Sequence, residues 1–205
     1  MISKPKYKIA RRLGPEIFEK TQTKKFATRE ARKSQPFLLK HGRSRSDYGT
    51  ALLEKQKARY LYGIGERQFA RYVASVSGKG KSSTPEEKFF CQLENRIDNT
   101  VYRLGFARTR REARQLVSHR HIILDGKVVK SPSYSVSVGD KLGIRSGSLS
   151  KPAFSGLFEK IKEHKPPSWL RLDLDKREGE VVGMPVFSRE ALPFSIEKII
   201  ELYRR

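Results

Sequence analysis

Cysteine is almost absent from this sequence of 205 residues, because Cys91 is the only one. A single cysteine excludes an intrachain disulfide and a zinc site built from several cysteines. No run of residues reaches the roughly 18 apolar positions that a membrane-spanning helix needs. The first twelve residues, MISKPKYKIARR, also lack the apolar stretch of a secretory signal. We therefore expect an intracellular protein with no membrane partner, no metal and no cofactor.

Acidic residues are scarce relative to basic ones, with 22 Asp and Glu against 44 Lys and Arg, which gives a formal net charge of +22. A field of this strength attracts polyanions, so nucleic acid is the expected partner. Apolar residues make up 37% of the chain, which is too many for a wholly disordered basic tail. The composition therefore predicts at least one packed core together with a nucleic-acid-binding surface.

Half of the excess charge lies in residues 1–45, which hold 14 basic and 3 acidic residues and so carry +11. This stretch has few apolar residues and contains several Pro and Gly residues that break regular structure. Such a segment does not readily bury a core of its own. We predict a basic, extended N-terminal arm that becomes ordered against its polyanion. The alternative is a disordered arm that only keeps the protein soluble.

The remaining sequence alternates between helical and strand patterns. Helices are predicted at 46–63, 66–76, 91–105, 110–118, 151–166 and from Ser195 to the end, with a turn-rich linker at 77–87. The motif HIILDGKVVK at 121–130 reads as two short strands around an Asp-Gly turn, and further strands are expected at 140–146, 169–174 and 181–187. Within 86–145 this gives two or three helices followed by a small sheet.

No set of side chains typical of catalysis is present. GKGKSS at 78–83 resembles a phosphate-binding loop, but its first glycine would fall on Ser75, so the motif fails. His119 and His121 have no third ligand at metal-binding spacing, and the acidic turn at 173–180 places its glycine one position away from the calcium-loop register. These histidines are better suited to stacking on RNA or hydrogen bonding to it. The sequence predicts a protein that is not an enzyme.

The positive signal is a group of arginines at the start of a capped helix. In ARTRREARQLVSHRH, Thr109 and Glu112 form a capping box, and Arg110 and Arg114 follow at helical i,i+4 spacing. Forked guanidinium groups at this spacing can grip adjacent phosphates, and the exposed N–H groups of the first turn also favour an anion. A solvated charged face is the simpler alternative. RNA binding is favoured because the charge on this helix is positive apart from the single capping Glu112.

These residues also carry a family resemblance. The block RIDNTVYRLGFARTRREARQLVSHRHIILDGKVV at 96–129 resembles the S-four RNA-binding domain, in which two helices present a basic face to RNA and a small antiparallel sheet backs them. HGRSRSDYG at 41–49, EKQKARYLYGIGERQF at 54–69, PSWLRLD at 167–173 and IIELYRR at 199–205 resemble the small-subunit ribosomal protein S-four family. Together they cover nearly the whole chain.

The resemblance implies a primary 16S rRNA-binding protein that recognises a five-way helical junction and nucleates assembly of the small-subunit body. It also implies that small-subunit protein five is a neighbour, that the pair contributes to decoding accuracy, and that the chain lies near the mRNA entrance. We add small-subunit proteins three and twelve as possible neighbours, and we expect no homo-oligomer. Many family members hold an N-terminal zinc with four cysteines, which this sequence lacks, so a zinc-free variant is implied.

By matched position, the family's RNA contacts fall on His41, Lys55, Lys57, Arg59, Arg67, Arg96, Arg103, Arg110, Arg114, Gln115 and His119. To these we add basic residues of the arm and of the capped helix, together with the cap itself: Lys8, Arg11, Arg12, Arg43, Arg45, Thr109, Arg111 and Arg120.

The predicted fold class is α+β. It has a basic extended arm at 1–45, a helical lobe at 46–93 plus 156–205, and an inserted S-four domain of short helices on a small antiparallel sheet at 94–155. The expected location is the ribosome in the cytoplasm, and an organellar ribosome stays open. Two alternative functions remain at this point: an RNA-modifying enzyme that carries the same module, and a free mRNA-binding translational regulator.

Overall fold

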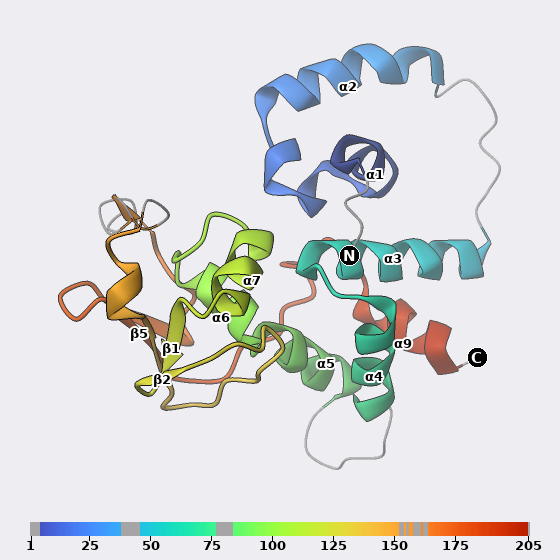
Figure 1. Ribbon diagram of the computed structural model, residues 1–205. Coiled ribbons are helices and arrows are strands. Elements are labelled where there is room, and N and C mark those ends of the chain that lie inside the picture. Colours follow the sequence, from blue (N-terminus) through green and yellow to red (C-terminus); the bar gives the residue numbers. More distant parts are fainter. Residues whose placement is uncertain are drawn as a thin grey trace. The chain divides into compact units, whose positions relative to one another are not determined.

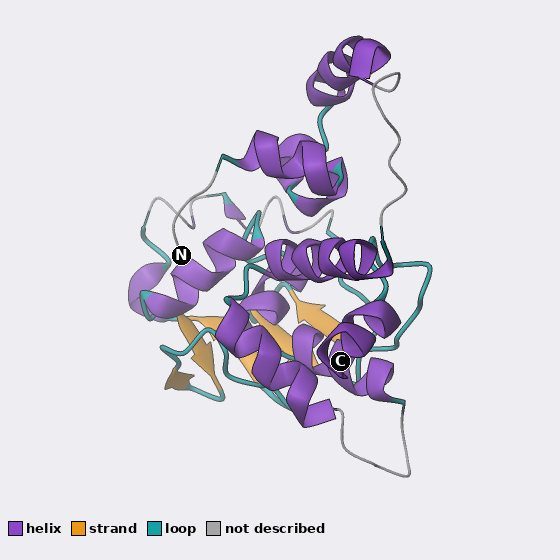
Figure 2. Cartoon of the chain, turned by 90° about the vertical axis from the view of Figure 1, so that its right-hand side faces the viewer, coloured by secondary structure: helices purple, strands orange, loops and turns teal. Residues whose placement is uncertain are grey.

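The computed structural model describes residues 5–37, 46–76, 84–151, 154, 156, 157, 161 and 164–204 (Figure 1). The chain forms two compact units. Unit 1 comprises Met1–Phe89 and Ser188–Arg205, and unit 2 comprises Phe90–Phe187. The described strands all belong to unit 2, whereas the described regular structure of unit 1 is helical (Figure 2). The α+β class predicted from the sequence is confirmed.

Unit 1 is built from α1 (Lys6–Leu13), α2 (Lys24–Phe37), α3 (Asp47–Tyr62), α4 (Glu66–Val76), the first half of α5 (Pro85–Glu94) and α9 (Ile196–Arg204). Helix α3 begins and ends as the sequence predicts. Ser46 Oγ accepts a hydrogen bond from Gly49 N at 3.2 Å, and Gly63 adopts the left-handed conformation with φ of 65°. The core of the unit includes Phe69 and Phe89, whose ring centroids lie 5.4 Å apart, and Ile199 from α9.

The N-terminal arm is helical in its described part, which differs from the extended arm expected from the sequence. Ala10, Leu13, Ile17 and Phe26 are buried, and α1 contacts α3. Two short 3-10 helices, Pro15–Ile17 and Glu19–Thr21, connect α1 to α2. The few apolar residues of the arm therefore suffice for a helix because α3 supplies the other side of the contact.

Unit 2 begins with an unexpected break. One helix was expected over 91–105, but α5 ends at Glu94 and α6 (Ile97–Arg103) begins after an extended Arg96. Hydrogen bonds to the segment at 132–136 cause this break. Ile97 N donates to Tyr134 O, and Val136 N donates to Asn95 O, both at 2.8 Å. The tertiary partner thus overrides the helical pattern of the sequence.

Helix α7 (Arg110–Ser118) leads into a sheet with strand order β2-β1-β3-β5-β4, all antiparallel. The strands are β1 (Ile122–Leu124), β2 (Lys127–Val128), β3 (Lys141–Ile144), β4 (Leu170–Asp173) and β5 (Glu178–Val181), and a short 3-10 helix, Ser146–Ser148, follows β3. Asp125 and Gly126 both have positive φ, as the Asp-Gly hairpin turn requires. The predicted hairpin is confirmed.

Helix α6 packs directly on this sheet. Its buried residues Ile97 and Val101, together with Leu104 directly after the helix, join the core with residues of β1, β3, β4 and β5. The close approach needs Gly179 on β5, because a Cβ at this position would overlap the Leu104 side chain. The helices that carry the arginines therefore sit on a rigid support.

The boundaries of the two units differ from the predicted domains. Residues 156–205 were expected to join the helical lobe, but β5 pairs with β3, so the segment up to Phe187 belongs to unit 2. Only the end of the tail, from Ser188, lies in unit 1, where Ser195 Oγ accepts from Lys198 N at the start of α9. Residues 78–83 and half of the predicted helix at 151–166 lie outside the described residues.

Candidate nucleic-acid interface

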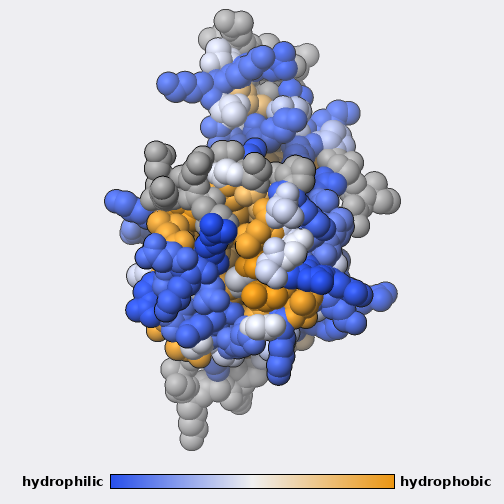
Figure 3. Space-filling view, turned by 60° about the vertical axis from the view of Figure 1, so that its left-hand side comes forward, coloured by the Kyte–Doolittle hydropathy of each residue, from blue (hydrophilic) through white to orange (hydrophobic). Residues whose placement is uncertain are grey.

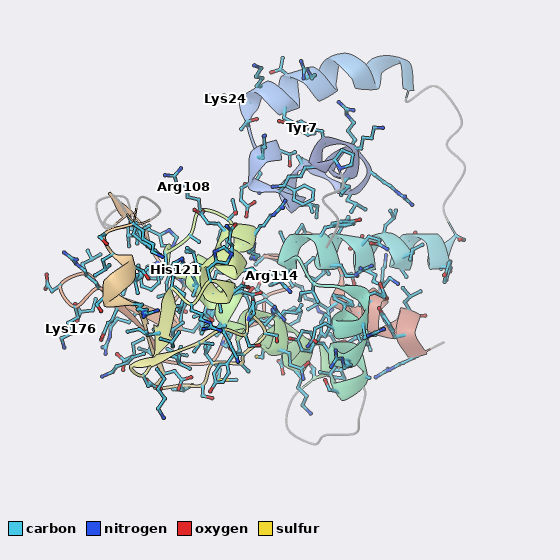
Figure 4. All side chains as sticks on the ribbon, viewed as in Figure 1. Tyr7, Lys24, Arg108, Arg114, His121 and Lys176 are labelled. Atoms are coloured by element: carbon cyan, nitrogen blue, oxygen red, sulfur yellow. The ribbon has the colours of Figure 1, made fainter. Side chains whose placement is uncertain are left out.

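Helix α7 begins with the reciprocal hydrogen bonds that the sequence predicts. Thr109 Oγ1 accepts from Glu112 N at 3.1 Å, and Glu112 Oε2 accepts from Arg108 N at 2.8 Å. The second bond reaches the residue before the cap rather than the cap itself. Both bonds fix the start of the helix from which Arg114 projects (Figure 4). We call Arg103, Arg110, Arg111 and Arg114 of α6 and α7 the arginine face.

Two side chains of α6 hold Arg110 in place. Arg110 Nε donates to Asn99 Oδ1 at 2.9 Å, and the guanidinium carbon lies 4.5 Å from the centroid of the Tyr102 ring. A hydrogen bond from one edge and an aromatic ring against one face restrict the rotation of the planar guanidinium group. A group held in this way is suited to directional contacts with a phosphate.

A buried glutamate supports Asn99 and Arg103. Glu94 is 1% exposed, and its two carboxylate oxygens accept from Nε and Nη2 of Arg103, each at 2.9 Å. Asn99 Nδ2 donates to both Glu94 Oε2 and Glu94 O at 3.0 Å, which turns the amide oxygen of Asn99 towards Arg110. Glu94 thus sets the position of Arg103 directly and that of Arg110 through Asn99.

A second buried carboxylate, Asp98, lies between two arginines. Arg96 Nε and Nη2 donate to its two oxygens at 2.9 and 2.6 Å, and Arg114 Nη1 lies 3.8 Å from Oδ2. Arg96 is only 2% exposed, so the structure places it in the interior, where it neutralises Asp98. The family resemblance assigns an RNA contact to Arg96. Because of this burial, we omit it from the proposed interface.

Several predicted contacts are exposed on α7 or directly after it. This set comprises Arg111, Gln115, His119 and Arg120. Hydrophilic residues cover much of the molecular face drawn in Figure 3. His121 is different, because its Nδ1 lies 2.9 Å from Ser148 Oγ. Partial burial and the nearby Lys151, His119 and Arg145 lower the pKa of His121, which favours its neutral form.

Unit 1 carries a separate group of predicted contacts on α3. Lys55 Nζ lies 3.2 Å from Glu66 Oε1, and Arg59 Nη1 lies 2.6 Å from Glu66 Oε2. The Tyr203 hydroxyl of α9 also donates to Glu66 Oε1 at 2.6 Å. Burial opposes ionisation of Glu66, but its hydrogen bonds and the two cations lower its pKa overall. Glu66 therefore ties α3, α4 and α9 together and fixes both cations.

The other predicted contacts of unit 1 are less constrained. Lys57 pairs with Glu54 at 2.9 Å, while Arg67 is exposed on α4. Lys8, Arg11 and Arg12 are exposed on α1. His41, Arg43 and Arg45 lie outside the described residues.

Neither a metal site nor a membrane span is found in the described part of the chain. None of the described residues form a group of three or more His, Cys, Asp or Glu side chains that could hold a metal. No helix among them is both long and apolar enough to cross a bilayer.

Sequence reasoning missed the acidic and amide groups that orient the arginines. Glu94, Asp98 and Asn99 are all buried, as part of the packed interior beneath the arginine face. The only available signal was the density of polar residues in ENRIDN, because the apolar spacing through Leu93, Ile97 and Val101 stays helical across it. Glu66 and Tyr203 gave no local signal, because they are 137 positions apart in the chain.

Two family models match the chain in succession. Residues 2–94 match the ribosomal protein S4/S9 N-terminal domain, and residues 95–142 match the S4 domain. The small ribosomal subunit protein uS4 of Chloroflexus aurantiacus is 40% identical over 208 residues, a match that covers 98% of this chain and 97% of that protein. The chain belongs to the uS4 family.

Other members of the uS4 family show the same degree of similarity. The protein named uS4 in Roseiflexus castenholzii is 43% identical over 204 residues, and that of Aquifex aeolicus is 39% identical over 206 residues. Each match covers 98% of this chain and 97% of the relative. The uS4 family consists of structural ribosomal proteins and not of enzymes, so the alternative of an RNA-modifying enzyme is set aside.

Proposed function

We propose that this chain is a structural constituent of the small ribosomal subunit and binds the subunit's rRNA through the arginine face. The observation that carries this proposal is the support beneath that face. Asn99 and Asp98, both buried, contact Arg110 and Arg114 on a capped helix. Arginines that serve only solubility need no such support.

The mechanism is thermodynamic. Each phosphate that a Lys or Arg neutralises releases condensed counterions, which gives affinity that falls steeply with salt. Because the arginine side chains are already oriented, RNA binding loses less side-chain entropy. The spacing of rigid helices reads the shape of a folded RNA rather than its sequence alone. Fixed cations therefore provide selectivity as well as affinity.

We further propose the finer role that the resemblance implies. The chain is a primary 16S rRNA-binding protein that recognises a five-way helical junction and nucleates assembly of the subunit body. It contributes to decoding accuracy with small-subunit protein five, has small-subunit proteins three and twelve as neighbours, and lies near the mRNA entrance. The cationic surfaces of both units support an extensive RNA contact of this kind.

The test is binding of the full-length protein to a 16S rRNA fragment that contains the five-way junction. A perfect RNA duplex of equal length serves as the matched control, and both are titrated across a salt series. We expect preference for the junction at every salt concentration and a steep log–log salt dependence. Equal affinity for junction and duplex would contradict the proposal. Co-sedimentation with small subunits in high salt tests the assembled state.

A further inference from the structure

A groove of about 380 Å³ lies between α1 and α3 in unit 1. Aliphatic side chains of both helices line it, together with an aromatic ring, an amide and two cations. The lining residues that matter here are Lys8, Ile9, Arg12, Leu52, Gln56 and Tyr60. Its volume is within the roughly 300–1,000 Å³ typical of sites for small organic groups.

The charge of this groove is of one sign. Lys8 and Arg12 are exposed and lie one helical turn apart on the same face of α1. Helix α1, with the sequence KYKIARRL, contains no acidic residue, and none lines the groove. A mostly apolar groove beside two cations is complementary to a molecule with an apolar body and a negative charge. A nucleotide has both properties.

The aromatic ring and the amide agree with this chemistry. Tyr60 is half-buried, and its ring meets that of Phe18 edge-on, with centroids 6.3 Å apart, which fixes its orientation. Bases stack on such rings in single-stranded RNA complexes. Gln56, one turn earlier on α3, lines the groove; its Oε1 accepts from Arg59 Nη1 at 3.4 Å, and its amide NH2 group can donate to the edge of a base.

We propose that this groove binds one unpaired nucleotide of a single-stranded RNA segment. The base lies against Tyr60 and the aliphatic residues Ile9 and Leu52, Gln56 contacts its edge, and Lys8 and Arg12 contact the flanking phosphates. The proposal rests on the RNA-binding function proposed above and adds to it a nucleotide-sized site in unit 1. The arginine face, in contrast, needs no unpaired base.

The first test is NMR of methyl-labelled full-length protein titrated with 5′-AMP and 5′-UMP. We expect saturating shifts of the methyl signals of Ile9, Leu13 and Leu52, which all line the groove. Buried Ile122 and Leu142 of unit 2 serve as internal controls and should not move. Ribose 5-phosphate, which lacks the base, should give much weaker shifts. The proposal would be overturned if the methyl signals of the groove did not shift with the nucleotides. It would also be overturned if ribose 5-phosphate shifted them equally. A peptide would then be the better occupant.

Variants test the same site with single-stranded RNA. Uridine hexamers are compared with hexamers that carry abasic positions, so that the phosphates are matched. We expect Tyr60→Leu to weaken uridine-hexamer binding by about 5- to 150-fold, the effect of losing one stacked base, and to leave the abasic hexamer unaffected. Tyr60→Phe keeps the ring and should bind like the wild type. Arg71→Gln removes an exposed cation outside the groove and is the charge control.

Two further results keep the test decisive. Arg12→Gln alters only an exposed residue, so it should fold normally and weaken both hexamers equally, even if Tyr60→Leu proves unstable. Binding to the five-way junction is measured in parallel. If the groove binds no nucleotide but the proposed function is correct, the groove methyl signals do not shift and the protein still prefers the junction. Failure of the proposed function would remove junction preference while the nucleotides still shift those methyls.

Discussion

The amide oxygen of Asn99 accepts a hydrogen bond from Arg110 Nε at 2.9 Å, while its amide nitrogen donates to Glu94 at 3.0 Å. Only this orientation of the amide satisfies both neighbours, because a carboxylate accepts and a guanidinium donates. A buried side chain thus determines how a half-exposed arginine is presented. Asn99 is therefore the point at which the core and the arginine face are coupled.

Replacing Asn99 with Asp should destabilise unit 2 in a pH-dependent way. Two buried carboxylates about 3 Å apart repel each other, so the pKa of one of them rises. We expect a loss of about 2–4 kcal/mol in unfolding free energy at pH 7 that shrinks as pH falls and one carboxylate takes up a proton. Fluorescence of the single Trp169, which is buried in unit 2, reports the urea transition. Gln115→Glu on the exposed surface is the control. If the Asn99→Asp variant lost the same unfolding free energy at every pH, the account would be contradicted.

Arg96 and Arg114 contact the same carboxylate but should behave in opposite ways. Arg96→Gln leaves Asp98 buried without its main partner and should cost about 3–5 kcal/mol of stability. Arg114 is about half exposed, so Arg114→Gln should change stability by less than about 0.5 kcal/mol. Junction RNA binding should weaken in the folded Arg114 variant. Urea denaturation measures the stability of both variants, and RNA titration measures their affinity. Equal losses of stability in the two variants would refute the prediction.

Glu66 should make unit 1 sensitive to acid. Its pKa is lowered in the folded protein, so its ionised form stabilises the fold above the ordinary value of 4.5, and this contribution disappears as pH falls through the lower folded value. Glu66→Gln should therefore be less stable than the wild type at pH 7, with a difference that narrows below pH 4.5. Thermal melts followed by circular dichroism measure this, and Glu197→Gln on α9 is an exposed control. A constant difference across pH would exclude this role.

Deleting residues 1–45 should separate affinity from shape recognition. The segment carries half of the net charge and the α1 side of the groove, so its loss should reduce electrostatic binding and remove the nucleotide site, while the arginine face of unit 2 stays intact. If the arm engages about four phosphates, the log–log salt slope should become shallower by about 3 units. The preference for the junction over duplex RNA should survive. A truncated chain with an unchanged slope but no preference would assign junction recognition to the arm.

Local signals in the sequence were sufficient for α7 and for the β1–β2 hairpin. Thr109 and Glu112 interact across one helical turn, and Asp125 and Gly126 form a turn by their own backbone preferences. Such features depend on neighbours within four residues. The arginines of α7 were recognised for the same reason.

Features that depend on distant partners were not predictable in this way. Arg96 is basic and follows a helical pattern, but hydrogen bonds to the segment at 132–136 break the helix there and bury the side chain. The pairing of β5 with β3 joins residues 35 or more positions apart and moves part of the tail into unit 2. The arm became helical because α3 covers its few apolar residues. Tertiary contacts decided each of these outcomes.

The most direct test of the central claim is junction binding by the double variant Arg110→Gln and Arg114→Gln. Charge-assisted phosphate contacts contribute about 1–3 kcal/mol each, so the account predicts weaker binding by about 2–6 kcal/mol with an unchanged circular dichroism spectrum. The matched control is the double variant Lys127→Gln and Lys130→Gln, which removes two exposed cations of the β1–β2 hairpin region. It should retain nearly full affinity. An arginine double variant that binds the five-way junction as tightly as the wild type would contradict the account and place the RNA-binding surface elsewhere.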